Sequence, residues 1–221
     1  MKTHFVYQLI PLTMLLFGCS SNPPPVWQSN AHSALQSFSS AYLTGNSRVA
    51  ELEFSRARNE IASTGRADLL ARAELMRCAT RAASLEFDNC AGFQPLAQDA
   101  DASERSYAAY LTGHWEGLAP DLLPIQHRAL IKATTTAGEQ SRLNSIDDPL
   151  SRLVAAAALL QTGRLTPADI TVATETASNQ GWRRPLLAWL GVQAQRAQAA
   201  NDHEAAARIQ RRIDLVSKPL L

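Results

Sequence analysis

A helical pattern of apolar residues recurs along the chain and constrains the fold more than any other feature of the sequence. Within each segment the apolar side chains fall three or four residues apart, which places them on one face of a helix. Only residues 170–176, rich in Val and Thr, resemble a strand, and the capping signal before them favours a helix. We therefore predict an all-α protein.

Turn residues divide this pattern into separate helices. Gly45, Gly65 and Gly113 follow three of the segments, as glycine often does because it adopts the left-handed conformation without strain. Asp148-Pro149 and Thr166-Pro167 are start signals, in which a capping side chain precedes a proline in the first turn. The predicted helices cover residues 31–44, 47–63, 67–87, 103–112, 120–137, 149–162, 167–177, 185–200 and 203–216. Because the connections are short, we expect an irregular array of antiparallel helix hairpins.

The amino terminus has the layout of a secretory signal. Lys2 is followed by the apolar run of residues 5–17, which is shorter than the roughly 20 residues of a membrane-spanning helix. Leu16, Gly18 and Cys19 then resemble the lipobox of bacterial lipoproteins. The alternative is an ordinary signal peptide with a chance cysteine.

The lipobox resemblance implies a membrane anchor and a location. Residues 1–18 would be the lipoprotein signal peptide, and acyl chains on Cys19 would hold the protein on a membrane. Ser20 stands where an Asp retains lipoproteins of this family in the inner membrane. The resemblance therefore implies an outer-membrane lipoprotein that faces the periplasm.

The residues after Cys19 predict a spacer between the lipid and a folded body. Pro23, Pro24 and Pro25 favour a stiff polyproline II conformation. We expect a tether over residues 19–29 and a single α-helical domain over residues 30–221. The oligomeric state is left open.

Charge argues against a nucleic-acid partner. The chain has 21 Lys+Arg and 20 Asp+Glu, and loss of Lys2 with the signal peptide would balance the two. A neutral chain offers no overall attraction for a polyanion. We therefore expect no nucleic-acid binding.

The remaining cysteines, Cys78 and Cys90, suit an oxidising compartment in which disulfides persist. Cys78 falls on the apolar face of its helix with Leu75 and Ala82. A chain reversal near residues 87–89 brings Cys90 back toward it. We predict a Cys78–Cys90 disulfide, and the alternative is two separate buried thiols.

Part of the chain resembles the tetratricopeptide repeat. Gly45-Asn46, Ala50, Phe54 and Ala57 match the turn glycine, the small packing residues and the aromatic residue of that repeat. The turn Asn201-Asp202, with Ala206 and Pro219, matches again near the carboxyl end. The first helix of each pair departs from the consensus, and Trp189-Leu190-Gly191 has its residue types packed too close together. The resemblance implies a TPR-like α-solenoid with a concave binding surface.

Candidate catalytic and metal motifs fail on their spacing. His203-Glu204 opens a zinc-protease pattern, but Ala207 occupies the position of the second histidine ligand. His114-Trp115-Glu116 combines a base, an aromatic ring and a carboxylate, and needs a loop conformation to converge because adjacent helical residues do not face each other. His127 stands alone and predicts no site. We expect no catalytic residue, no metal site and no cofactor.

Basic residues near the carboxyl end form the remaining surface feature. They are Arg183, Arg184, Arg196, Arg208, Arg211 and Arg212. Guanidinium groups suit the carboxylates of a partner or the phosphates of lipid headgroups, and the alternative is a solvated face with ion pairs. The leading functional hypothesis is a lipid-anchored helical adaptor that binds another cell-envelope protein without catalysis. The alternative is a peptidoglycan-acting enzyme or its accessory subunit.

Overall fold

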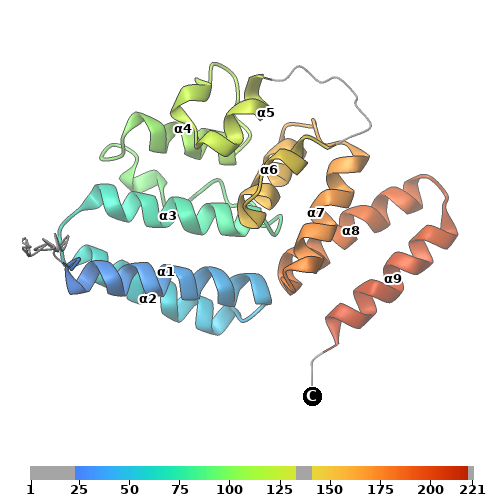
Figure 1. The fold of residues 1–221 in the computed structure, drawn as a ribbon, viewed down its shortest axis with the longest axis horizontal. Helices are drawn as coiled ribbons and strands as arrows, with labels where there is room; N and C mark the ends of the chain where they lie inside the picture. Colours follow the sequence, from blue (N-terminus) through green and yellow to red (C-terminus); the bar gives the residue numbers. More distant parts are fainter. Residues whose placement is uncertain (1–22, 133–140, 219–221) are drawn as a thin grey trace, which may run out of the picture.

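The computed structural model describes residues 23–132 and 141–218. Its α-helices are α1 (Val26–Thr44), α2 (Ser47–Ala62), α3 (Ala67–Ala82), α4 (Ala102–Leu111), α5 (Arg128–Lys132), α6 (Pro149–Gln161), α7 (Pro167–Asn179), α8 (Arg183–Ala199) and α9 (His203–Ser217). Short 3-10 helices join some of them: η1 (Gln94–Leu96), η2 (Pro120–Leu122), η3 (Ile125–His127) and η4 (Arg142–Ser145). No strand occurs in these two ranges, so the all-α prediction is confirmed (Figure 1). The predicted signal peptide, Cys19 and Pro219 lie outside the described residues.

Two helices begin at the capping signals seen in the sequence. Asp148 accepts a hydrogen bond from the Ser151 backbone N–H at 2.7 Å, and Pro149 is the first residue of α6. Thr166 and Asp169 form a reciprocal capping box at the start of α7. The Val- and Thr-rich segment that follows is therefore helical, as its capping signal predicts.

Two predicted boundaries are wrong. Helix α1 begins at Val26, so residues 26–29 belong to the helical body and not to the tether. Helix α3 ends at Ala82, five residues before the predicted end, because the chain turns at Leu85 with a φ of +60°. This early turn leaves room for the loop that carries Cys90.

The helix predicted over residues 120–137 is also wrong. The structure has η2, η3 and the five-residue helix α5 in its place, and residues 133–140 lie outside the described chain. Pro124 explains the break, since it lacks a backbone N–H and disfavours helix at Leu123, the residue before it. Leu123 has the extended conformation that this predicts, with φ −85° and ψ 157°.

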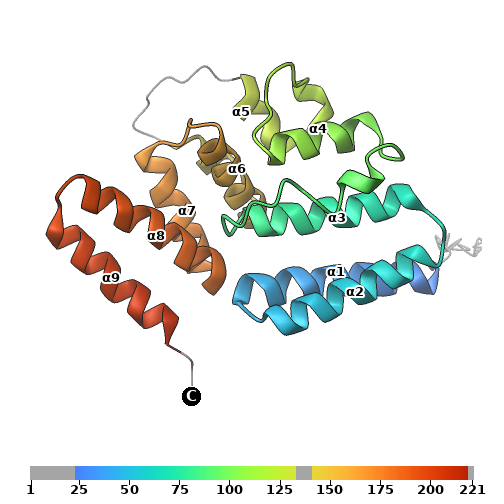
Figure 2. The ribbon, with the colours of Figure 1, turned by 180° about the vertical axis from the view of Figure 1, so that it is seen from behind.

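The helices pack in an array that brings early and late segments together. Helices α1 and α2 form a pair that packs against α3, and α4 contacts α3 as well (Figure 1). Helix α6 contacts α3, α4 and α7, and the α8–α9 hairpin stands at the far end (Figure 2). Helix α1 also contacts α8, so the first helix meets the carboxyl-terminal half of the array.

The core has two parts. The smaller one joins α1 and α2 around Phe38 and Phe54, whose ring centroids are 5.1 Å apart. Ala50 and Ala57, the small packing residues of the repeat-like segment, are fully buried. The larger part surrounds α6, where residues 155–158 are four consecutive buried alanines. Such small side chains let the helices that contact α6 approach it closely.

Candidate functional site

A cleft of about 590 Å³ lies between α3, α4, α6 and the segment that joins α4 to α5. Its volume falls within the range of roughly 300–1,000 Å³ that is typical of ligand pockets. The side chains that line it are Arg72, Leu75, Met76, Ala79, Asp101, Ser103, Glu104, Tyr107, Asp121, Leu122, Leu123, Pro124, Arg128, Leu150, Ser151 and Val154. We take this cleft as the candidate binding site.

The cleft has a largely apolar lining. On α3, Leu75, Met76 and Ala79 line it along one turn of the helix. On α6, Leu150 and Val154 line it at the four-residue spacing that puts both on one face. An apolar group that enters the cleft therefore gains roughly 25 cal/mol for each Å² of apolar surface removed from water.

One side of the cleft carries an ion-pair cluster that ties α3 to α4. Arg72 forms an ion pair with Glu104 and lies 3.7 Å from the Asp101 carboxylate. The Asp101 side chain is about half exposed, whereas the Glu104 side chain is buried. The cluster therefore fixes this side of the cleft and leaves an acidic group, Asp101, facing solvent.

The segment that joins α4 to α5 brings Asp121 to the cleft lining, and the start of α5 brings Arg128. Asp121 is highly exposed and lies 3.9 Å from the Lys132 ammonium. The Arg128 Nε–H donates a hydrogen bond to the Leu123 carbonyl at 2.8 Å, which holds that guanidinium on its own segment. Among the side chains that line the cleft, three carboxylates face two guanidinium groups. The cleft therefore combines an apolar lining with a slight excess of negative charge.

A buried histidine lies beside the cleft. His127 has no exposed surface, and its Nδ1 lies 3.2 Å from the Tyr110 hydroxyl. Its ring also stacks on Tyr107, a cleft residue, with 5.9 Å between centroids. Burial lowers the pKa of His127 to about 4, although the charge of Asp148 opposes part of this effect. The imidazole is therefore neutral at pH 7.

The sequence interpretation of His127 as an isolated residue missed this packing. A signal was present, because Leu123, His127, Leu130 and Ile131 repeat at the spacing of one helix face. Leu123, His127 and Leu130 are all buried in the structure, even though the continuous helix is broken. A histidine at this spacing is therefore expected to be buried together with Leu123 and Leu130.

The His114-Trp115-Glu116 cluster does not converge. Trp115 is buried, stacks on Tyr110 with 5.2 Å between centroids, and donates its indole N–H to the Tyr110 carbonyl at 3.0 Å. His114 and Glu116 are exposed and line a separate hollow of about 350 Å³. The aromatic residue is therefore part of the core, whereas the base and the carboxylate remain at the surface.

A buried carboxylate lies elsewhere on α3. The Glu74 side chain is 2% exposed and lies 3.2 Å from the Arg58 guanidinium. Burial raises the pKa of Glu74, while the charges of Arg58 and Arg77 oppose the shift. Gly92 packs directly against this carboxylate, where a larger residue would collide with it. Glu74 lines neither of the two hollows, so we assign it a structural role.

Comparison with known proteins assigns this chain to no family. No protein-family model matches the chain, and neither does any curated protein or solved structure. Within the described residues, no helix is both long and apolar enough to cross a bilayer. The same residues contain no group of three His, Cys, Asp or Glu side chains arranged to hold a metal ion.

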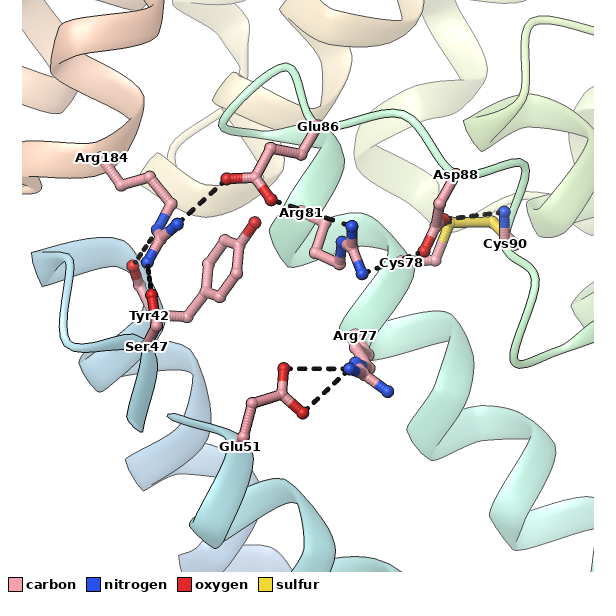
Figure 3. Close-up of polar contacts among 10 residues, drawn as sticks. All are labelled: Tyr42, Ser47, Glu51, Arg77, Cys78, Arg81, Glu86, Asp88, Cys90 and Arg184. Atoms are coloured by element: carbon pink, nitrogen blue, oxygen red, sulfur yellow. Dashed lines mark hydrogen bonds and ion pairs between the residues drawn. A yellow bond between two sulfur atoms is a disulfide. The ribbon is translucent and has the colours of Figure 1, made fainter. Parts of the chain in front are cut away.

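Arg184, one of the residues predicted to bind a partner, makes contacts within the protein (Figure 3). Its guanidinium donates hydrogen bonds to the Tyr42 carbonyl at 2.8 Å, the Ser47 hydroxyl at 2.6 Å and the Glu86 carboxylate at 3.0 Å. It also lies 4.2 Å from the centroid of the Tyr42 ring. Arg184 therefore joins α8 to the α1–α2 turn and to the loop after α3.

The predicted disulfide between Cys78 and Cys90 is confirmed (Figure 3). It closes the loop that leaves α3, in which Asp88 accepts a hydrogen bond from the Cys90 backbone N–H at 3.0 Å. Asp88 also lies 3.2 Å from the Arg81 guanidinium. The bridge therefore fixes the same loop that presents Glu86 to Arg184.

The other predicted basic residues divide into two groups. Arg183 is half-buried and donates a hydrogen bond to the Ser217 carbonyl at 2.9 Å, so it caps the end of α9. The remaining four, Arg196, Arg208, Arg211 and Arg212, are exposed on the α8–α9 hairpin. The structure therefore leaves these four accessible to a partner.

Replacing Arg208, Arg211 and Arg212 together by Ser is expected to leave the melting temperature nearly unchanged. These side chains are exposed, and the ion pair that Arg208 forms with Glu204 is of the surface kind that contributes little. Calorimetry measures the melting temperature. An unfolded triple variant would contradict this prediction.

Proposed function

We propose that this protein is a lipid-anchored adaptor of the bacterial cell envelope, which binds a segment of another envelope protein in the cleft between α3, α4 and α6. The cleft carries the proposal, because its volume and its apolar lining suit the side chains of a ligand. Catalysis is not part of the proposed role. The protein acts by holding its partner near the membrane.

The chemistry of the cleft favours an amphipathic partner segment with basic residues. Apolar side chains one helical turn apart match the spacing of Leu150 and Val154 on α6. Lys or Arg residues beside them complement the exposed carboxylates of Asp101 and Asp121, which both line the cleft. The acidic excess of the lining disfavours an acidic segment of the same shape.

The anchor is proposed from the lipobox resemblance at Leu16, Gly18 and Cys19. Acylation of Cys19 places the body at the outer membrane, facing the periplasm. Since α1 begins at Val26, only residues 19–25 separate the lipid from the first helix. At about 3.1 Å per residue of polyproline II, this spacer reaches roughly 20 Å. The adaptor therefore works close to the membrane surface.

We also propose that the helix hairpins form a TPR-like array. Ala50, Phe54 and Ala57 of α2 are buried, as the resemblance implies for the second helix of a repeat. The α8–α9 hairpin turns at Asn201, which has a φ of +56°. Hairpins of this kind present extended binding surfaces in solenoid proteins.

Site-specific photo-crosslinking in bacterial cells tests the proposal. A photoreactive phenylalanine analogue replaces Leu122, which lines the cleft and is 37% exposed. The matched control places the same analogue at Leu52 of α2, which is 66% exposed and does not line the cleft. We expect position 122 to crosslink to a protein segment with helically spaced apolar and basic residues, and position 52 to give no such product. The Cys19→Ala form is expected to be unacylated, to leave the membrane if it is processed, and to lose the crosslink.

Other crosslinking products decide against the adaptor. Peptidoglycan fragments attached at position 122 would favour the alternative, an enzyme or accessory subunit that acts on peptidoglycan. Equal products at positions 122 and 52 would show that the cleft has no particular role. Full membrane retention and acyl labelling of the Cys19→Ala form would exclude the lipid anchor.

A binding assay tests the chemistry of the cleft directly. The probes are a synthetic amphipathic helical peptide of Leu and Lys and its isostere with Glu in place of Lys. The Leu/Lys peptide is expected to bind more tightly, and Leu122→Arg is expected to weaken its binding about tenfold through lost apolar contact and added repulsion. Leu52→Arg adds the same charge elsewhere and is expected to change little. Tighter binding of the Glu peptide would contradict the proposed partner chemistry.

A further inference from the structure

One wall of the cleft is built from an irregular segment that depends on the rest of the protein for its position. This segment, residues 119–132, contains η2, η3 and α5, and it contributes Leu122, Leu123, Pro124 and Arg128 to the cleft. The three helices are three, three and five residues long. Helices this short are not stable alone in water. The wall is therefore held by the side chains that it buries.

The buried side chains of the wall include one titratable group. Leu123, His127 and Leu130 are its buried anchors, each with at most 2% exposed surface. His127 fits against α4, with its ring centroid 4.8 Å from that of Tyr110 and 5.9 Å from that of Tyr107. Its Nε2 atom has no hydrogen-bond partner among the described residues. This environment accepts a neutral imidazole and offers an imidazolium no acceptor at Nε2.

The charged and titratable groups around His127 come from three elements. From α4, Tyr107 and Tyr110 face His127. Burial raises the pKa of both phenols, so both stay neutral at neutral and acidic pH. From the start of α6, the Asp148 carboxylate favours the charged imidazole. On residues 119–132 themselves, Arg128 is the next residue after His127, and its guanidinium donates a hydrogen bond to the Leu123 carbonyl. Burial outweighs the attraction of Asp148 and lowers the pKa of His127 to about 4.

We propose that His127 is a pH-sensitive anchor of the cleft wall. Neutral His127 holds residues 119–132 against α4, and protonation of His127 in acid releases this wall and weakens binding in the cleft. The effect on binding rests on the proposed function, whereas the movement of the wall is independent of that function.

The direction follows from linkage between protonation and opening. In the open wall His127 meets water and has an ordinary pKa of about 6.5, whereas in the closed wall its pKa is lowered. The open form therefore binds more protons, and acid favours it. The closed wall has its full stability above about pH 6.5 and loses it progressively as the pH falls toward 4. Between about pH 7.5 and pH 5 the opening equilibrium shifts by roughly 30-fold.

Hydrogen exchange of the full chain in detergent tests the movement without any ligand. The backbone amides of residues 121–132, except Pro124, are followed at about pH 7.5 and pH 5 and corrected for the intrinsic effect of pH on exchange. We expect their opening constant to rise about 30-fold in acid in the wild-type chain, and to rise far less in His127→Gln and His127→Phe. His114→Gln, at an exposed position, is the matched control and is expected to keep the wild-type response.

The imidazole NMR signal of His127 gives a reading that needs no variant at position 127. A signal that titrates in the ordinary range near pH 6.5 in the folded chain would overturn the proposal. So would an opening constant that stays the same at the two pH values, or a response that persists in both His127 variants.

Binding of the synthetic Leu/Lys peptide separates this inference from the proposed function. If the peptide binds wild type more weakly at pH 5 and binds His127→Gln equally at both pH values, His127 controls binding in the cleft. If the peptide binds with the same Kd at both pH values, control of binding by His127 is excluded while the adaptor function stands, and hydrogen exchange decides whether the wall opens in acid. If no binding occurs at any pH but the exchange response is present, the wall opens as proposed and the adaptor function fails.

Discussion

Replacing Trp189 by Ala is expected to lower the free energy of unfolding by about 3–5 kcal/mol. Trp189 has no exposed surface and lies in the larger part of the core. Its indole N–H donates a hydrogen bond to the Ala83 carbonyl at 3.2 Å, so it also joins α8 to the end of α3. Removing the ring leaves a cavity where two distant parts of the chain meet. Since typical stabilities are about 5–15 kcal/mol, the variant will be marginal.

Trp189→Phe distinguishes the contribution of the apolar ring from that of the indole hydrogen bond. Phe retains much of the apolar volume but leaves the buried Ala83 carbonyl without this donor, which costs about 1–3 kcal/mol. Trp27→Ala is a second control, since Trp27 is only half-buried near the start of α1. Urea denaturation measures all three. A loss for Trp189→Ala no larger than that for Trp27→Ala would show that α8 does not pack as described.

The class of the fold could be predicted because its signals are local. A capping side chain and a proline set the start of α6 and of α7, and each acts within one helical turn. Gly45 ends α1 with a φ of +96°, as its position in the sequence indicates. Features that a few neighbouring residues determine are therefore visible without any tertiary information.

The break at Pro124 shows where a local signal was overruled by a stronger one. The apolar spacing on both sides of Pro124 favours a helix, and Leu123 and Leu130 of this pattern are buried, whereas Leu122 and Ile125 are exposed. Proline nevertheless prevents the backbone hydrogen bond that a continuous helix needs at this position. The side-chain pattern was thus a partial guide to burial and a poor guide to backbone conformation.

The candidate site could not be predicted, because its residues come from segments far apart in the sequence. Leu75, Tyr107, Leu122 and Val154 meet only when α3, α4, η2 and α6 pack together. Arg184 shows the same limit in another form. Its charge suggested an exposed partner contact, but its acceptors Tyr42 and Glu86 lie 142 and 98 residues away in sequence. Only the tertiary structure reveals that these groups use its donors.

The contacts of Arg184 also connect the disulfide to the packing of α8. The loop that Cys78 and Cys90 close contains Glu86 and Asp88, and these carboxylates pair with Arg184 and Arg81. The loop therefore holds acidic groups in place for cations on two different helices. We therefore expect loss of the covalent link to destabilise the packing of α8, which lies about a hundred residues further along the chain.

The double substitution Cys78→Ala/Cys90→Ala is expected to cost about 3 kcal/mol of stability. The bridge joins residues 12 apart in sequence, and loop closure of this length accounts for about 3 kcal/mol in the chain-entropy model. Both cysteines are buried, so the added loss of packing has the same sign. Urea denaturation measures the total. Hydrogen exchange is expected to rise first in residues 83–92 and then at the start of α8, where Arg184 loses its fixed acceptor.

Asp88→Asn, with the disulfide intact, is the control that separates the covalent link from the polar contacts. It removes the charge that faces Arg81 and keeps an oxygen for the Cys90 N–H, so a loss well below that of the double substitution is expected. Wild type unfolded in reductant should resemble the double variant, and reductant should not change that variant further. Unchanged wild-type stability in reductant, with reduction of the thiols verified, would show that the bridge does not stabilise the fold. If stability falls by about 3 kcal/mol but exchange protection at α8 stays normal, the disulfide stabilises only its own loop. That result would exclude coupling through Glu86 and Arg184.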